Sequence, residues 1–328
     1  MSILASVKKY FDWFTLALVI AVLLAVFLPA TGDVYTAFNL TGKVVVAALF
    51  FLHGLKLSPS NLWAGLTNWR LHVVIVVASF ILFPILGLAL KPIIIFLAGN
   101  DLYQGVLFVC VLPSTVQSSI AFTSIAGGNV AAAVCAASFS SLLGVFVTPV
   151  LVNLLMRTTV GTSLSAAIWD LCVQLVFPFV LGQALRPFLA NWVQRRKKLI
   201  GVTDRLSVIF IVYVSFSRGT TSGLWGSLSF QILVALLIGC ALLLGLALLA
   251  TSCGGRLLGF PLADRIVIVF CGSKKSLITG VPMANIIFPP ELAGVIILPL
   301  MFFHQMQLVV CSLLAKRYAV TNVPETGY

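Results

Sequence analysis

The sequence predicts an all-α polytopic membrane protein with about ten transmembrane helices. Hydrophobic residues make up 61% of the 328 residues and charged residues 9%, whereas an average soluble domain has roughly 45–50% and 25%. The apolar residues form long continuous runs, and about 20 residues of helix cross the hydrocarbon core of a bilayer. Strands of a membrane β-barrel would alternate apolar and polar residues, which these runs do not. A very apolar soluble fold is disfavoured because too few polar residues remain to cover its surface.

Ten apolar runs lie between polar breaks, and their boundaries carry errors of a few residues. Lys8 and Lys9 precede the first run as in a signal peptide, but this run is long enough to span and further spans follow. The seventh run is the shortest; it ends before Arg218, or alternatively extends to Trp225. The expected spans are 13–30, 38–56, 71–97, 103–123, 128–155, 164–187, 205–217, 228–252, 264–286 and 292–315.

Basic residues predict the orientation. The net charge is +12, but these residues separate the apolar runs instead of forming one patch, so we expect a lipid bilayer as partner and no nucleic acid. With both termini in the cytoplasm of a cell inner (plasma) membrane, four basic residues lie outside and fourteen inside. The fourteen are Lys8, Lys9, Lys56, Arg70, Arg186, Arg195, Arg196, Lys197, Lys198, Arg205, Arg256, Arg265, Lys316 and Arg317. The cluster 195–198 is interpreted as a topology anchor, with a lipid-binding patch as the alternative.

Five spans precede about residue 160 and five follow it. We therefore predict two five-helix repeats, 1–160 and 161–328, within a single transmembrane domain. An odd number of spans per repeat makes the second repeat inverted relative to the first. Inverted repeats are common in secondary transporters, which bind substrate near the midplane where helices are broken.

Two equivalent breaks carry the predicted site. Residues 113–119 interrupt the fourth span and residues 271–276 the ninth, and Pro113 and Ser273 are 160 positions apart. Backbone groups freed inside a membrane need partners from side chains, water or a ligand. For the hydroxyl residues the alternative is helix–helix packing. The predicted substrate- or ion-binding residues are Ser114, Thr115, Gln117, Ser118, Ser119, Ser273, Lys274, Lys275, Ser276 and Thr279.

Lys274 and Lys275 are the most unusual of these residues. A charged lysine at the bilayer centre costs at least about 2.5–3.5 kcal/mol. The alternative is that both extend to an interface. No acidic residue lies firmly within a predicted span, and Asp170 is the one candidate counter-ion. The lysines are therefore expected to meet a substrate anion, unless desolvation leaves one neutral.

The remaining polar residues do not predict catalysis. The seven cysteines lack CxxC spacing and are interpreted as packing residues; no metal site, cofactor or enzyme motif is expected. Residues 127–129 (Gly-Gly-Asn) predict a tight turn. His304, near Gln305 and Gln307, is interpreted as structural rather than as a proton relay, and Gln174 and Gln183 with Asp170 as a weak cavity lining.

Long strings of the sequence resemble one family. LPSTVQSSIAFTSIAGGNVAAAVC (112–135), VFCGSKKSLITGVPMANIIFP (269–289) and LPLMFFHQMQLVVC (298–311) resemble the SBF-like branch of the bile acid:sodium symporter family, and FFLHGLKLS (50–58) and WRLH (69–72) fit as well. The resemblance implies a ten-helix transporter with a panel domain (spans 1, 2, 6 and 7) and a core domain whose fourth and ninth helices are discontinuous and cross. It also implies an organic anion as substrate.

The ninth-helix break departs from the sodium-coupled members. Those members have a glutamate, glutamine and asparagine there, whereas this chain has Gly272-Ser273-Lys274-Lys275-Ser276. A lysine ammonium can physically take the place of a sodium ion, so sodium or proton coupling stays open. We predict a symporter-like secondary active transporter of a small organic anion, working by alternating access. The alternative functions are a non-transporting membrane regulator of ion homeostasis and, more remotely, an intramembrane enzyme.

Overall fold

The computed structural model describes residues 13–56, 68–156, 169, 172–223, 226 and 228–321. All regular structure within these ranges is helical, which confirms the predicted class. The helices are α2 (Trp13–Phe27), α3 (Gly32–Lys56), α5 (Trp69–Val77), the π-helix η2 (Ala78–Leu82), α6 (Phe83–Ala89), α7 (Lys91–Ala98), α8 (Asn100–Val111), α9 (Gln117–Ile125), α10 (Val130–Met156), the π-helix η3 (Cys172–Val176), α12 (Phe177–Arg195), α13 (Lys197–Thr221), α14 (Phe230–Leu257), α15 (Leu262–Gly272), α16 (Leu277–Ile287) and α17 (Pro290–Thr321).

Seven helical stretches among the described residues are long and apolar enough to cross a membrane. Two shorter apolar helices, Trp13–Phe27 and Val173–Leu189, coincide with two further predicted spans. The chain is therefore a multi-pass membrane protein. The seven stretches are Gly32–Lys56, Trp69–Ala89, Val130–Met156, Lys198–Thr221, Phe230–Leu257, Leu262–Ile287 and Pro290–Val320.

The predicted seventh span, 205–217, is too short. Helix α13 begins at Lys197 and ends at Thr221, because the polar residues before 205 continue the helix instead of forming a loop. Asp204 lies buried in it, with 3% of its surface exposed, and pairs with Lys56. The prediction that no acidic residue lies within a span is therefore wrong.

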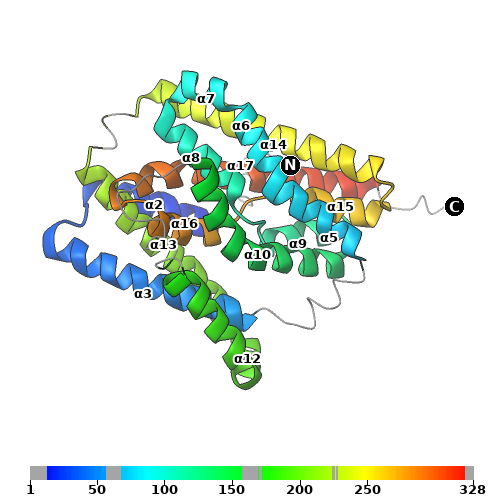
Figure 1. Ribbon diagram of the computed structural model, residues 1–328, viewed down its shortest axis with the longest axis horizontal. Helices are drawn as coiled ribbons and strands as arrows, with labels where there is room; N and C mark the ends of the chain where they lie inside the picture. Colours follow the sequence, from blue (N-terminus) through cyan, green and yellow to red (C-terminus); the bar gives the residue numbers. More distant parts are fainter. Residues whose placement is uncertain are drawn as a thin grey trace. The chain divides into compact units, whose positions relative to one another are not determined.

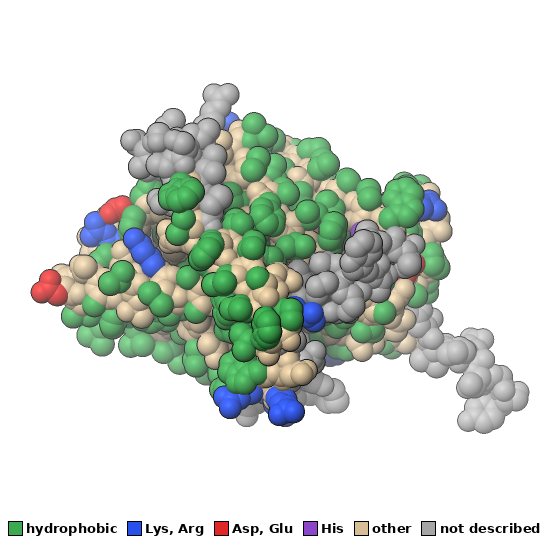
Figure 2. All heavy atoms as spheres, turned by 60° about the horizontal axis from the view of Figure 1, so that its bottom comes forward, with side chains coloured by type: hydrophobic (Ala, Val, Ile, Leu, Met, Phe, Trp, Pro, Cys, Tyr) green, Lys and Arg blue, Asp and Glu red, His purple; other side chains and the backbone are tan. Residues whose placement is uncertain are grey.

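The surface has the character that a lipid environment requires. Figure 2 shows hydrophobic side chains over much of the face in view and few charged side chains, most of them near its edges. Phe96, Phe188 and Phe230 are each more than 80% exposed. Extended apolar surface of the kind shown in Figure 2 marks contact with another apolar phase, here the lipid.

The first of two compact units comprises residues 1–58, 149–234 and 278–300. It contains α2, α3, α12 and α13, which correspond to the expected panel spans, but also residues 278–300 of α16 and α17, which belong to the ninth and tenth spans and were expected outside the panel. Figure 1 shows α3 (blue) alongside α12 and α13 (green). Glycines permit the close α3–α12 contact: a Cβ added at Gly54 would lie 2.2 Å from the Phe179 carbonyl oxygen, and one at Gly182 would lie 2.2 Å from the Phe51 oxygen. Gln183 donates to the Gly54 oxygen at 2.7 Å, so its amide serves this packing.

The second unit comprises residues 59–148, 235–277 and 301–328. Its core is built mainly from small and branched side chains of α5, α10 and α15, including Ile75, Ala133 and Val267. The predicted turn at 127–129 is confirmed: Gly127 has a φ of +71°, which glycine adopts without strain. The Asn129 side chain then caps α10 by accepting from the Ala132 amide at 3.0 Å.

Candidate functional site

Both predicted helix breaks exist, and they meet within the second unit. The first separates α8 from α9 across residues 112–116, and the second separates α15 from α16 across residues 273–276. The Ser276 amide donates to the Pro113 carbonyl oxygen at 3.0 Å. One backbone hydrogen bond thus joins the two breaks directly.

The first break frees a set of carbonyl oxygens. Pro113 has no N–H to continue α8, and the Ser114 N–H, which would bond the Cys110 oxygen in a regular helix, donates to Ser140 Oγ at 3.1 Å. Leu112 has extended backbone angles, with φ −76° and ψ 154°. The Val111 oxygen accepts from Thr148 Oγ1 at 2.8 Å. The oxygens of Cys110 and Leu112 are therefore available to another donor.

Lys275 is that donor, and it is fully buried, with 0% of its surface exposed. Its Nζ donates to the carbonyl oxygens of Ser79 at 2.7 Å, Cys110 at 2.9 Å and Leu112 at 2.7 Å. An ammonium has three N–H donors, so every one has a partner. The Phe83 ring centroid lies 4.1 Å from the same nitrogen, a favourable cation–π distance.

The third oxygen is free because of the π-helix η2. The Phe83 N–H donates to the Ala78 oxygen, five residues back, in the π pattern. Continuing this pattern would require an N–H at Pro84 to reach the Ser79 oxygen, and proline has none. Lys275 Nζ takes the vacant position.

Lys274 is also 0% exposed but has a different environment. Its Nζ donates to Ser118 Oγ at 3.3 Å and lies 4.4 Å from the Phe122 ring centroid and 5.7 Å from that of Phe270. Among the described residues no carboxylate forms an ion pair with it or with Lys275. Since neither lysine is exposed, the alternative that they extend to an interface is wrong.

A chain of hydroxyls leads away from Lys274. Ser118 donates to Thr115 Oγ1 at 2.8 Å, Thr115 and Ser119 share a bond of 2.9 Å, and Ser119 donates to the Phe270 oxygen at 2.9 Å. Each hydroxyl has one hydrogen, and that of Ser119 is committed to the carbonyl. Thr115 must therefore donate to Ser119, and all bonds in the chain point from the ammonium toward the Phe270 oxygen.

The other predicted site residues lie outside this chain of hydroxyls. Ser114 is buried, and its Oγ makes a long 3.4 Å contact with the Thr115 oxygen; Gln117 is exposed. Ser273 Oγ donates back to the Val269 oxygen in its own helix at 2.6 Å. Ser276 is buried and contributes its amide. Thr279 is buried in α16, in the first unit.

Gln307 is a site residue that the sequence did not single out as one. Its Oε1 accepts from the Lys275 amide at 2.8 Å, and its Nε2 donates to the Lys275 oxygen at 2.8 Å. Gln307 Nε2 also lies 2.8 Å from His304 Nδ1. Because an amide nitrogen only donates, its second N–H donates to His304 Nδ1. His304 thus supports Gln307 rather than Lys274 directly. The one signal for Gln307 in the sequence is that it is a polar residue within a largely apolar stretch of α17.

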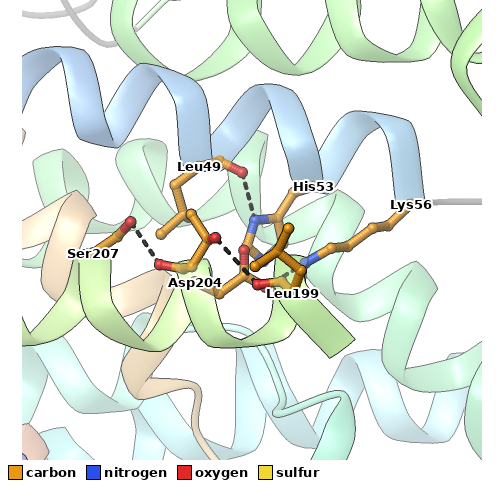
Figure 3. A network of polar contacts seen from close by, with 7 residues as sticks. Leu49, His53, Lys56, Leu199, Asp204 and Ser207 are labelled. Carbon is orange, nitrogen blue, oxygen red and sulfur yellow. Dashed lines mark hydrogen bonds and ion pairs between the residues drawn. The ribbon is translucent and has the colours of Figure 1, made fainter. Parts of the chain in front are cut away.

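A second charged cluster lies in the first unit. Figure 3 shows Lys56 Nζ bonded to the Asp204 carboxylate between α3 and α13, with His53 one helical turn before Lys56. His53 Nδ1 is 2.7 Å from the Leu49 oxygen. Asp204 Oδ1 is buried and has no hydrogen-bond partner among the described residues. The counter-ion proposed from sequence, Asp170, lies outside the described residues.

Comparison with known proteins identifies the family. The model of the SBF-like CPA transporter family matches residues 12–320. An uncharacterised protein of Pseudomonas aeruginosa is 50% identical over 94% of this chain and 93% of its own length. YfeH of Escherichia coli strain K12, provisionally named a symporter, is 46% identical over 94% of this chain and 93% of its own.

More distant relatives come from animals. Sodium/bile acid cotransporter 7 of Rattus norvegicus is 30% identical, with 96% of this chain and 94% of the relative covered. The likeness therefore extends over nearly the whole of each protein and includes both helix breaks. The family resemblance predicted from the sequence is confirmed, and the chain belongs to the SBF-like CPA transporter family.

Proposed function

We propose that this protein is a secondary active transporter that moves a small organic anion across the cell inner membrane by alternating access. The observation that carries the proposal is the junction of two helix breaks around two buried lysines that have no carboxylate partner among the described residues. Ionisable residues inside a membrane protein are expensive and commonly mark a transport pathway. Membership of a transporter family supports the same conclusion.

Lys274 is the residue proposed to attract the anion. Lys275 uses its three donors on backbone oxygens, whereas Lys274 has one hydroxyl partner and two aromatic rings. A carboxylate or sulfonate oxygen near Lys274 would supply the missing opposite charge and offset the cost of burying the ammonium. The hydroxyls of Ser118, Thr115 and Ser119 would orient the bound group.

The names of two relatives bear on substrate and coupling. The rat relative is named for sodium and bile acid, and the Escherichia coli relative for symport. We propose the shared substrate chemistry, an organic anion, and leave sodium and proton coupling to the experiment below. We also propose ten crossings with both termini in the cytoplasm, and an inverted repeat that relates the two breaks.

Uptake by proteoliposomes tests the proposal. Organic anions that raise the melting temperature of the purified protein are radiolabelled and offered with sodium or choline at two pH values. Lys274→Ala should lower uptake at least about tenfold, which corresponds to about 1.4 kcal/mol. Lys43→Ala is the matched control, because Lys43 is exposed in α3. Unchanged uptake by Lys274→Ala would rule out the charge role, and a regulator would show neither a stabilising solute nor uptake.

A further inference from the structure

Lys275 Nζ sits at a point where three backbone oxygens converge. The oxygens of Ser79, Cys110 and Leu112 lie 2.7–2.9 Å from the nitrogen. We propose that these oxygens form a seat for an ammonium-type monovalent cation, that Lys275 is its permanent tethered occupant, and that the seat accepts a free ammonium or methylammonium ion when this side chain is shortened.

The seat is built independently of the lysine. The Ser79 oxygen lacks a helical donor because Pro84 has no N–H, and the Cys110 oxygen lacks one because the Ser114 N–H donates to Ser140. Removing the Lys275 side chain changes neither condition. Three buried carbonyl oxygens would then be left without a donor, which is costly in an apolar interior.

The backbone around the seat has supports of its own. Gln307 bonds the Lys275 amide and carbonyl, the Ser276 amide bonds the Pro113 oxygen, and Thr148 Oγ1 bonds the Val111 oxygen. None of these bonds involves the Lys275 side chain. We therefore expect the oxygens to keep their arrangement in a variant that lacks the ammonium.

The surroundings select the class of cation. Three oxygens are too few for Ca²⁺ or Mg²⁺, which take six or more oxygen ligands. The distances are those of charged N–H···O hydrogen bonds, and the Phe83 ring, at 4.1 Å, presents a face that suits an organic or inorganic ammonium. A small ammonium with N–H donors fits this arrangement, whereas a quaternary ammonium has no hydrogen to donate.

The neighbouring lysine gives an internal comparison. Lys274 Nζ has one hydroxyl oxygen as partner, so its removal leaves no set of converging carbonyls. The consequence for transport rests on the proposed function: a cation fixed in the chain at this point does not have to be supplied from solution. Binding of an added cation to a shortened variant does not depend on that function.

Thermal unfolding in detergent tests the seat without any organic anion. Lys275→Ala should melt below the wild type, and ammonium or methylammonium chloride should raise its melting temperature saturably at constant ionic strength. Wild type, Lys274→Ala and Lys275→Met should not respond, because in Lys275→Met an apolar side chain of similar length fills the seat. Tetramethylammonium should have no effect on any of them.

A second readout applies where Lys275→Ala does not survive purification. The amount of monodisperse protein solubilised from membranes with and without methylammonium is measured by size-exclusion chromatography, and methylammonium should restore it for Lys275→Ala alone. An equal response of Lys274→Ala, a response to sodium alone, or no response in either assay overturns the proposal. Loss of organic-anion uptake leaves this result unaffected, so the two proposals fail separately.

Discussion

Gln307 holds the peptide of Lys275 from both sides, with its amide oxygen 2.8 Å from the Lys275 nitrogen and its amide nitrogen 2.8 Å from the Lys275 oxygen. A side-chain amide here does what a neighbouring strand or the next turn of a helix does elsewhere. The break in α15–α16 therefore has its own partner for the backbone groups at Lys275, contributed by α17.

Gln307→Ala should destabilise the protein strongly. It leaves a buried N–H and a buried C=O without partners, and each such group costs about 1–3 kcal/mol. The melting temperature in detergent measures the loss. Gln117→Ala is the matched control, because Gln117 is exposed, and it should melt within error of the wild type. Equal melting of the two variants would show that water or a shift of the backbone replaces the two hydrogen bonds between Gln307 and the Lys275 backbone.

Variants of the hydroxyl chain should distinguish an effect on protein stability from an effect on transport. Ser119→Ala should lower stability by about 1–3 kcal/mol because the buried Phe270 oxygen loses its side-chain donor and Thr115 its acceptor. Ser118→Ala should instead reduce uptake, since it removes the hydroxyl that contacts Lys274. Ser273→Ala is the control, because Ser273 bonds an oxygen that its own amide already contacts. Melting curves and uptake are compared for all three, and a reversed pattern for Ser118 and Ser119 contradicts the assignment.

The Lys56–Asp204 pair should respond asymmetrically to mutation. Lys56→Ala leaves a carboxylate that is 3% exposed without its partner, and breaking a buried pair in this way costs about 3–5 kcal/mol. Asp204→Asn should cost less, because Lys56 is 31% exposed and its ammonium can turn to solvent. The double variant should be more stable than Lys56→Ala alone.

The pair Arg218–Glu291 provides the comparison for this cycle, since its side chains are 41% and 45% exposed. Removing either member should lower the melting temperature little, because solvent screens an exposed ion pair. Melting temperatures of these five variants test both pairs together. Additive effects of the Lys56 and Asp204 substitutions would show that the buried pair contributes no coupling.

Gly54→Ala should separate α3 from α12. Its new methyl would lie 2.2 Å from the Phe179 oxygen, a backbone atom that cannot move alone, and overpacking of this kind costs about 1–3 kcal/mol or more. Gly42→Ala in the same helix meets nothing within 4 Å and should be neutral or slightly stabilising, because alanine favours helix over glycine by about 1 kcal/mol. Melting temperatures distinguish these outcomes. Equal values would mean that the helices pack less closely than described.

Local signals explain what the sequence predicted well. Pro113 lacks the N–H that would continue α8, and the two breaks could be placed because at each of them a helix breaker and several hydroxyl residues lie within a few positions of one another. The residue pairs that complete the site could not be placed this way. Gln307 is 32 positions from Lys275 and the Ser79 oxygen is 196, so their contribution depends on tertiary packing.

Asp204 shows a different limit. A hydropathy reading ends a span at charged residues, and this rule excluded the polar start of α13. The carboxylate is buried because Lys56, 148 positions away, meets it. A charge that is paired in space is indistinguishable in the sequence from one that is solvated.

The oxygens around Lys275 belong to the main chain, so the side chains of the residues that supply them do not encode the site. The side chains of Ser79, Cys110 and Leu112 do not contact the ammonium through these bonds. Alanine substitution at these three positions would leave their carbonyls in place, so an alanine scan would not detect the site. The information lies instead in Pro84, which lacks the N–H that would reach the Ser79 oxygen, and in Ser140, whose hydroxyl takes the Ser114 N–H away from the Cys110 oxygen.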